Sequence, residues 1–290
     1  ISWMLAERHD CKVALIDPKV ESGVWYPNYG AWRKEWNCLG DKMGLPEIKD
    51  CLTTDWEYTD CFFGGSYDIP MSKRTTLRQP YVRVDKRKLK DLFIKKFKES
   101  GNGVTIPSKI TTECIGPNIF KNNRIQHFED HSVITLDDGE KIKCKLIVDS
   151  TGAESSLVMR EDPIYARGSE KELKTGYQIA YGFIAHVDNI GPYDPKAMTL
   201  FDYRTDHLEP GSAALADAID RPTFMYVMPL QQYPDGSYRV FFEETSLVGE
   251  GKRRLSFETC KARAMKRLEF LGIDVLGLEE EEYCYIPMGG

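Results

Sequence analysis

Two adjacent glutamates, Glu243 and Glu244, interrupt an apolar run in the stretch YRVFFEETSLV of residues 238–248. The flanking residues alternate and are rich in β-branched and aromatic types, which predicts a strand. Carboxylates are rarely buried without a partner, so the pair indicates either an exposed edge strand or a buried acid. In an apolar pocket, desolvation raises the pKa of a carboxylic acid, and a second carboxylate nearby raises it further. Such a group stays protonated near neutral pH and can donate a proton.

Strand geometry separates the two glutamates. Successive side chains of a regular strand point to opposite faces, so only one glutamate can face a given site. Glu243 shares its face with Phe241 and Thr245, and Glu244 shares the other face with Phe242. A β-bulge would bring both carboxylates to one site, and the sequence leaves that alternative open.

The first quarter of the chain begins with a helical pattern followed by a buried strand over residues 12–16, which ends on Asp17. In a dinucleotide-binding βαβ unit, an acid at the end of the second strand hydrogen-bonds the ribose. Taken alone, Asp17 is more simply explained as a strand-end residue before Pro18. Residues 85–100 then predict an amphipathic helix with an apolar face and a lysine face.

The middle of the chain predicts a hairpin at Asp138-Gly139, followed by a buried strand over residues 145–149. That strand runs into Thr151 and Gly152. Such a turn is typical of flavin-binding Rossmann domains, where glycine lets the backbone approach the cofactor closely. A tight strand-end turn without a ligand is the alternative.

Beyond Gly152 the composition changes, and the pattern predicts a second sheet followed by a helix over residues 257–271. Ser256 is the expected N-cap of this helix and Gly272 its stop. The expected antiparallel strands of the sheet are residues 175–187, 197–204, 223–230 and 238–248.

Bulk properties limit the possible functions. The net charge of −6 provides no basic patch for nucleic acid. The eight cysteines are scattered without a CxxC pair, which favours free thiols in a reducing compartment and no metal site. No apolar run approaches the roughly 20 residues that span a bilayer, so any membrane association is expected to be peripheral. The chain opens without Met and closes on IPMGG, so we expect a fragment of a longer protein.

Several segments along the chain are informative together. They are VWYPNYGAW, RQPYVRVDKRKLK, LIVDSTG, TGYQIAYG, FDYR, FFEETSLV and IPMGG. In order and spacing these segments resemble those of plant and algal lycopene cyclases, flavoproteins that close the ionone rings of carotenoids. FFEETSLV resembles the family's Phe-Leu-Glu-Glu-Thr motif with Phe242 in place of Leu, and FDYR departs from its Asp-Trp-Arg by having Tyr203.

The resemblance implies an α/β fold: an aromatic-hydroxylase-like, FAD-binding Rossmann-type domain interleaved with an antiparallel-sheet α+β substrate domain. We expect residues 1–152 to form part of the FAD domain and residues 153–290 mainly the substrate domain. The glycine motif and the last flavin-contacting segment would lie outside this chain, which by itself is expected to be inactive. Reduced FAD is the implied cofactor and NAD(P)H its electron source. The expected cofactor-binding residues are Asp17, Arg83, Thr151 and Gly152.

The implied reaction is a non-redox cyclisation of the ψ end groups of lycopene. A proton adds to the terminal double bond, the ring closes on the resulting cation, and a proton leaves. The resemblance favours Glu243 as the proton donor, with Glu244 in a structural or charge-tuning role. Asp202 and Arg204 are possible orienting partners, although a strand-edge ion pair explains them equally well. The aromatic residues expected to stabilise the cation are Phe241, Tyr177, Tyr181 and Tyr203.

The remaining expectations concern products and partners. A β ring is favoured over an ε ring, and a related epoxy-carotenoid substrate remains open. The implied partners are a C40 carotenoid and a plastid membrane surface. Two alternatives compete with this interpretation. One is an FAD-dependent monooxygenase of the same fold, and the other is a non-catalytic isoprenoid-binding protein.

Overall fold

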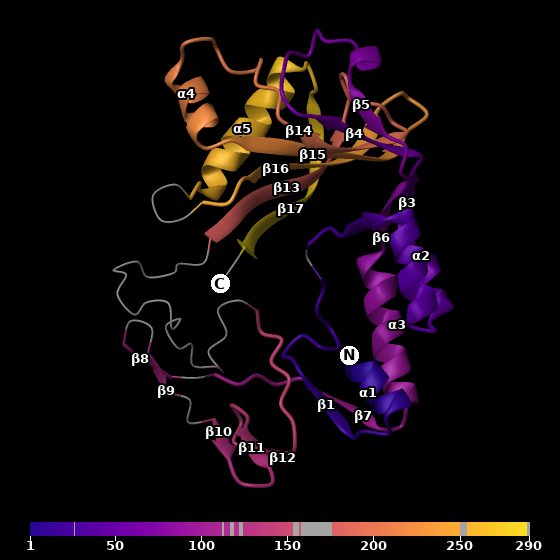
Figure 1. Ribbon diagram of the computed structural model, residues 1–290, viewed down its shortest axis with the longest axis vertical. Coiled ribbons are helices and arrows are strands. Elements are labelled where there is room, and N and C mark those ends of the chain that lie inside the picture. The colour runs from indigo at the N-terminus through magenta and orange to yellow at the C-terminus, as the bar shows by residue number, and fades with distance from the viewer. Residues whose placement is uncertain are drawn as a thin grey trace. The chain divides into compact units, whose positions relative to one another are not determined.

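The computed structural model describes residues 1–25, 27–111, 113–116, 119–121, 124–152, 157, 176–249 and 254–288. The chain divides into two compact units. Unit 1 comprises residues 1–25 and 87–173, and unit 2 comprises residues 26–86 and 174–290 (Figure 1). The sequence analysis expects two interleaved domains, the first in residues 1–152 and the second mainly in residues 153–290. In the structure, residues 26–86 group with the C-terminal half, and their strands pair within the sheets of unit 2.

Unit 1 is built around a short parallel pair of strands next to helices. Strand β1 pairs with β7 from Val13↔Gly103 to Ile16↔Ile106. Helix α3 confirms the predicted amphipathic helix and buries Phe97, whose ring lies 2.7 Å from where a Cβ at Gly103 would stand. A three-stranded sheet contains the predicted hairpin, with Gly139 at φ +90° in its turn. The elements are α1 (Ser2–Arg8), β1 (Val13–Ile16), α3 (Lys86–Glu99), β7 (Gly103–Ile106), β8 (Glu113–Gly116), β9 (Ile119–Lys121), β10 (Ile125–His127), β11 (Ser132–Thr135) and β12 (Lys141–Cys144).

The strand predicted over residues 145–149 is absent. These residues follow β12 without a strand neighbour in the part of unit 1 that the structure describes, and their apolar side chains are not buried. Leu146 is 72% exposed and Val148 54% exposed. An apolar run becomes a strand only when another strand satisfies its backbone groups.

Unit 2 contains a seven-stranded sheet in the order β17-β13-β16-β15-β14-β4-β5, and a three-stranded sheet in the order β2-β6-β3. The four strands predicted for the larger sheet are confirmed, and β4, β5 and β17 are three additional strands that the sequence analysis did not predict. The strands are β2 (Gly30–Trp32), β3 (Leu52–Trp56), β4 (Tyr58–Phe62), β5 (Thr75–Leu77), β6 (Tyr81–Val84), β13 (Gly176–Val187), β14 (Ala197–Asp202), β15 (Thr223–Gln232), β16 (Tyr238–Ser246) and β17 (Val275–Met288).

Helix α5 lies against β13 and β16 on one face of the large sheet (Figure 1). It begins at the predicted N-cap, because the Thr259 N–H donates to Ser256 Oγ at 3.2 Å. Phe242 belongs to the core beneath α5, whereas Phe241 packs with Trp56 on the opposite face. The helical elements of unit 2 are α2 (Arg33–Lys42), η1 (Pro46–Asp50), η2 (Met71–Lys73), α4 (Ala213–Asp220) and α5 (Phe257–Phe270).

Two further features bear on the expected environment. The seven cysteines that the structure describes are all free thiols. Within the same described ranges, no helix is long and apolar enough to cross a membrane.

Candidate active site

Two glutamates from different strands meet on the face of the large sheet away from α5. Gly182 of β13 is directly opposite Glu243 on β16 and, on its other side, Glu282 on β17. Residues directly opposite in a sheet share a face, so the two glutamates flank a position without a side chain. Their carboxyl groups are hydrogen-bonded to each other. A Cβ at Gly182 would stand 2.8 Å from Glu282 Cγ and 2.9 Å from the Phe241 ring, so glycine is required for this approach.

The two carboxyl groups have different hydrogen-bond partners. Glu282 Oε2 accepts from the backbone N–H of Asn28 at 3.0 Å and from its Nδ2 at 2.7 Å. Asn28 Oδ1 in turn accepts from the Arg83 guanidinium, with Nε at 3.2 Å. Glu243 Oε1 accepts from the Thr245 hydroxyl at 2.8 Å. The arrangement is a chain of polar contacts from Arg83 through Asn28 and Glu282 to Glu243.

The environment keeps the pair partly protonated. Burial, and then the charge of Glu282, raise the pKa of Glu243 to about 8. Burial also raises the pKa of Glu282, but the hydrogen bonds from Glu243 and Asn28 and the charge of Lys86 oppose that rise. Two carboxylates in contact cannot both ionise cheaply, so the pair retains a proton at neutral pH.

Aromatic rings surround Glu243 on this face. Tyr226 of β15 is directly opposite it, and Tyr81 of β6 packs against the same cluster as Phe241. Burial and then the charge of Glu243 raise the pKa of both tyrosines. A row of aromatic rings extends away from Glu243, and the centroids of neighbouring rings are 5.1 to 6.4 Å apart. The row consists of Tyr226, Phe224, Phe201, Tyr203 and Phe63.

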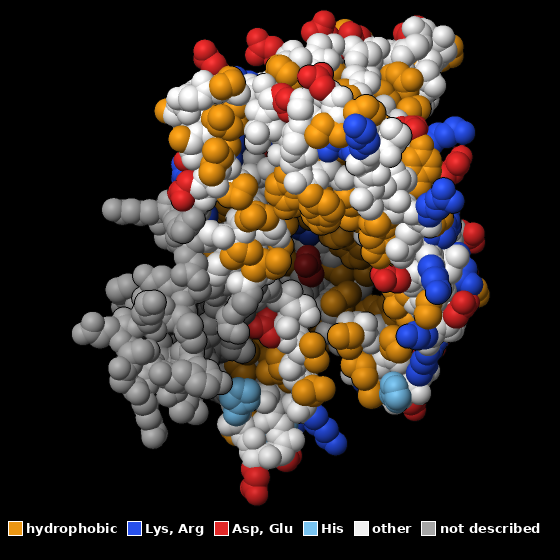
Figure 2. Space-filling model, turned by 45° about the horizontal axis from the view of Figure 1, so that its top comes forward, with side chains coloured by type: hydrophobic (Ala, Val, Ile, Leu, Met, Phe, Trp, Pro, Cys, Tyr) orange, Lys and Arg blue, Asp and Glu red, His pale blue; other side chains and the backbone are white. Residues whose placement is uncertain are grey.

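Phe63, at the end of this row, is 73% exposed. The space-filling view shows hydrophobic side chains gathered in a band across unit 2, in the upper part of the picture (Figure 2). The site therefore combines a protonated carboxyl with an apolar, electron-rich face. That combination suits the handling of a carbocation.

Glu244 has a different environment from Glu243, as strand alternation predicts. It is completely buried on the α5 side, where Arg267 Nη2 donates to its Oε1 at 3.1 Å and the Thr223 hydroxyl donates at 2.5 Å. The Arg267 Nε donates to the other carboxylate oxygen at 3.2 Å. The structure gives Glu244 the contacts of a buried ion pair.

The predicted pair Asp202 and Arg204 lies in the same buried network. Arg204 donates to both carboxylate oxygens of Asp202, with Nε at 2.9 Å and Nη2 at 2.7 Å. The guanidinium carbon of Arg204 lies 3.7 Å from the centroid of the Phe62 ring and 3.8 Å from that of Tyr67. Neither member of the pair faces Glu243, because Asp202 is opposite Met225, on the α5 side of the sheet.

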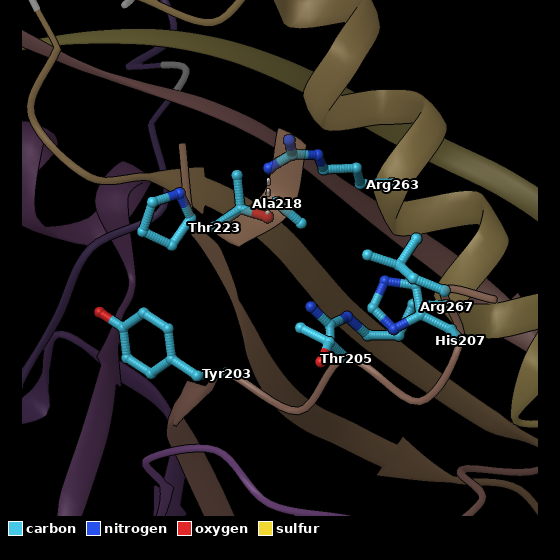
Figure 3. Close-up of a pocket in the computed structure, with 9 residues that line it drawn as sticks. Tyr203, Thr205, His207, Ala218, Thr223, Arg263 and Arg267 are labelled. Atoms are coloured by element: carbon cyan, nitrogen blue, oxygen red, sulfur yellow. Dashed lines mark hydrogen bonds between the residues drawn. The ribbon is translucent and has the colours of Figure 1, made fainter. Parts of the chain in front are cut away.

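A small cavity of about 30 Å³ adjoins this network (Figure 3). At one end of the cavity, Arg263 Nη1 donates a hydrogen bond to the hydroxyl of Thr223 at 3.2 Å. Arg267 and His207 lie at its other end. His207 is buried, and its Nδ1 has no hydrogen-bond partner among the residues that the structure describes. Burial lowers the pKa of His207 to about 3, so the ring is neutral at ordinary pH. The cavity is the size of a site for a single water molecule.

The aromatic residues predicted to stabilise the cation divide between the two faces. Phe241 and Tyr203 lie on the face of Glu243, as described above. Tyr177 and Tyr181 instead pack in the core beneath α5. The phenol of Tyr181 donates to Glu281 at 2.6 Å. The sequence did not indicate which face of β13 would meet Glu243, because that depends on the pairing register.

The four predicted cofactor-binding residues are divided between the two units. Asp17 is exposed directly after β1, and its Oδ1 accepts from the Lys19 N–H at 2.6 Å. Gly152 is exposed at φ +104°, and no atom of the described residues lies within 4 Å of the position of a Cβ. Thr151 donates its N–H to Asp149 at 2.9 Å. These three belong to unit 1, whereas Arg83 belongs to unit 2 and binds Asn28. No cluster of three or more His, Cys, Asp or Glu residues that could hold a metal ion occurs among the described residues.

Sequence reasoning missed Glu282, Gly182 and Asn28. Glu282 is the last of four consecutive glutamates, a run that is usually solvated. The available signal was the alternation of the segment EYCYIP, which begins with Glu282 and fits a strand. Gly182 interrupts a long apolar strand, and such a glycine often marks a close approach.

Comparison with solved structures defines the class of fold. A halogenase, PltM, in complex with phloroglucinol and FAD superposes with a TM-score of 0.52 at 12% identity, over 99% of this chain and 57% of that one. PqsL from P. aeruginosa in complex with 2-aminobenzoylacetate also gives 0.52 at 12% identity, over 98% and 69% of the two chains. The fold is that of FAD-binding flavoproteins of the aromatic-hydroxylase type.

Within this class, the family is defined by sequence. The model of the lycopene cyclase protein family matches residues 3–290, so the chain belongs to the lycopene cyclase family. It is 33% identical to lycopene beta cyclase from Arabidopsis thaliana, over 96% of this chain and 47% of that protein. It is 34% identical to capsanthin/capsorubin synthase from Citrus sinensis, over 100% of this chain and 49% of that one. The chain spans about half the length of the curated relatives it matches.

Proposed function

We propose that the protein containing this chain is a lycopene cyclase, which closes the ψ end groups of lycopene into ionone rings, with the β ring favoured. Membership of the family supports the reaction class. The observation that carries the mechanism is the protonated Glu243 on an aromatic sheet face, hydrogen-bonded to Glu282. An enzyme of this kind needs an acid that retains its proton in an apolar site.

The reaction conserves atoms and electrons. The O–H bond of Glu243 breaks as a C–H bond forms at the terminal double bond, and a tertiary cation results. The neighbouring double bond attacks that cation and closes the ring. A base then removes a proton from the new cation, so the product is an isomer of the substrate. The ring is a β or an ε ring depending on which carbon loses the proton.

The rings near Glu243 are proposed to stabilise the cation. Each aromatic face in a desolvated site contributes roughly 0.5–2 kcal/mol to a nearby cation. Tyr226 and Tyr81 flank Glu243, so we add them to Phe241 and Tyr203. Glu244, Asp202 and Arg204 are assigned positioning roles, since Arg267 of α5 contacts all three. It forms an ion pair with Glu244, lies 3.9 Å from Asp202 and donates to the backbone oxygen of Arg204 at 2.6 Å.

Reduced FAD is the proposed cofactor. The open, left-handed backbone at Gly152 and the exposed Asp17 and Thr151 suit the close approach of a dinucleotide. When bound, the reduced flavin would supply an electron-rich surface for the cation, and NAD(P)H would supply its electrons. Arg83 is better placed to orient Asn28 than to bind this cofactor, because its guanidinium is already hydrogen-bonded there.

The proposed setting is a plastid membrane. Several of the matched relatives are described as chloroplastic or chromoplastic. The substrate is a hydrocarbon dissolved in lipid, so the protein would act at the membrane surface. The relatives also include capsanthin/capsorubin and neoxanthin synthases, and a related carotenoid is therefore the second candidate substrate.

The decisive test is Glu243→Gln in the complete gene product, expressed in bacteria that accumulate lycopene. The wild type should yield cyclic pigments, and the variant should leave lycopene acyclic because the amide cannot donate the proton. Retained flavin absorbance would show that the variant is folded. Glu281→Gln is the matched control, since Glu281 contacts Tyr181 and Lys261 on the opposite face. Ring formation by Glu243→Gln would reject Glu243 as the donor, and O₂ uptake in proportion to product would favour a monooxygenase.

A further inference from the structure

We propose that Glu282 is a positioning residue that carries the negative charge of a two-glutamate pair and thereby keeps the transferable proton on Glu243. This proposal rests on the proposed function only for the use of the proton in ring closure. The location of the proton follows from the contacts around the pair.

The hydrogen-bond donors are distributed unequally. Glu282 receives two N–H groups from Asn28 on one oxygen, whereas among the described residues Glu243 receives the hydroxyl of Thr245. Donors aimed at a carboxylate favour its charged form. Lys86 adds a favourable charge near Glu282. The carboxylate is therefore on Glu282, and the carboxylic acid is on Glu243.

Arg83 determines which way Asn28 points. Its guanidinium donates from both Nε and Nη2 to Asn28 Oδ1. The carbonyl oxygen of Asn28 must therefore face Arg83, and its NH₂ group must face Glu282. A buried arginine thus sets the charge of Glu282 through one amide.

Gly182 sets the separation of the two carboxyl groups. Any larger residue would place a Cβ within 2.8 Å of Glu282 Cγ. The glycine allows two strands that do not pair with each other, β16 and β17, to share one proton across β13. Without that contact, Glu243 would lose the neighbouring charge that helps to keep it protonated.

The pair also has a function after the proton has left. When Glu243 gives its proton to the double bond, both carboxylates are ionised and face the new cation. Fixed negative charge in a water-poor site stabilises a developing positive charge. The doubly charged pair is also a better base than a single carboxylate, so it can accept the proton that the ring releases. Glu243 then returns to its starting state.

Other ionisable groups near the pair should not obscure its titration. The pKa of each neighbouring tyrosine and thiol is raised from a value that is already above neutral, so these groups stay neutral from pH 5 to about 9. Among the described residues, the groups facing the pair are Tyr29, Tyr81, Tyr226, Cys284, Arg83, Lys86 and Glu280, which is ion-paired with Lys86 at 2.6 Å.

The test is Glu282→Gln in the complete protein, read out by the infrared band of a protonated carboxylic acid. In the wild type, one such band should disappear with a midpoint near pH 8, and Glu243→Gln should lack that band. In Glu282→Gln the amide can donate to Glu243 and carries no charge, so the midpoint should fall by about one pH unit or more. Glu281→Gln should titrate like the wild type. An unchanged midpoint in Glu282→Gln would overturn the proposal.

The rate of ring closure supplies a second readout. The upper pH limit of activity should move down with the infrared midpoint. The rate should fall about fivefold or more at pH 8 and recover towards pH 6. A loss of activity equal at every pH would show a merely structural role and would also overturn the proposal. If the wild type closes no rings at all, the proposed function fails, while the infrared titration still decides the role of Glu282. Gly182→Ala, which separates the carboxyl groups, should lower the infrared midpoint in the same direction.

Discussion

At the scale of residues, the properties of Glu243 come from groups distant in the chain. Asn28 and Glu282, which hydrogen-bond each other, are 254 positions apart. Gly182 has no side chain and so leaves room for Glu282, and Tyr226 lies next to Glu243 on the neighbouring strand. Each of these contacts changes either the charge or the water content around one carboxyl group, and both determine whether it can act as an acid.

Tyr226 offers a test of the aromatic surface. Tyr226→Leu removes the ring next to Glu243 but keeps an apolar side chain, so ring closure should slow by roughly 2- to 30-fold. Tyr226→Phe retains the ring face and should stay close to the wild-type rate. Initial rates of pigment formation with the purified proteins would measure both effects. Equal losses in the two variants would instead assign the effect to the phenol hydroxyl.

At the scale of elements, strand β16 separates two kinds of chemistry. Its one face presents Glu243 among aromatic rings, and its other face presents Glu244 to Arg267 of α5. Arg267 is also 3.9 Å from Asp202, at the end of β14. One arginine thus ties a helix to two strands of the sheet that carries the acid.

Arg267→Met should strongly destabilise this arrangement. Removing one partner of a buried ion pair leaves an uncompensated charge and typically costs about 3–5 kcal/mol. Urea unfolding of the complete protein would measure the change in the free energy of unfolding. Arg239→Met is the matched control, because the pair of Arg239 with Glu279 is partly exposed and should contribute less than about 1 kcal/mol. A loss no larger than that of the control would contradict a structural role for the buried network.

At the scale of the whole molecule, the site lowers stability at neutral pH. Glu243 has a pKa of about 8 in the folded protein, against an ordinary value of 4.5. Between these two values the folded protein holds a proton that the unfolded chain has released. The free energy of unfolding therefore decreases as pH rises through this range, and the contribution present below pH 4.5 is lost by about pH 8.

Glu243→Gln should flatten this pH dependence. The slope that Glu243 contributes in the wild type is at most about 1.4 kcal/mol per pH unit, and the neutral amide removes it. Urea unfolding at a series of pH values would show the free energy of unfolding of the variant rising relative to that of the wild type as pH rises. Glu281→Gln should keep the slope, because hydrogen bonds from Lys261 and Tyr181 lower the pKa of Glu281. Parallel curves for wild type and Glu243→Gln would show that Glu243 is not protonated at neutral pH.

The sequence by itself determined what depends on local periodicity. Strand alternation placed Glu243 and Glu244 on opposite faces, and the apolar spacing and cap at Ser256 located helix α5. The resemblance of FFEETSLV and its companion segments identified the family that the comparisons show.

Only the tertiary structure decided which residues meet Glu243. Glu282 reaches it because β17 pairs with β13 in one particular register, and a shift by one residue would turn it away. Tyr181 lies on the other face for the same reason. Residues 145–149 form no strand despite their apolar pattern, since no described strand pairs with them. Strand pairing and register depend on contacts between residues far apart in the chain. They are determined by the free energy of the whole sheet and not by any short segment.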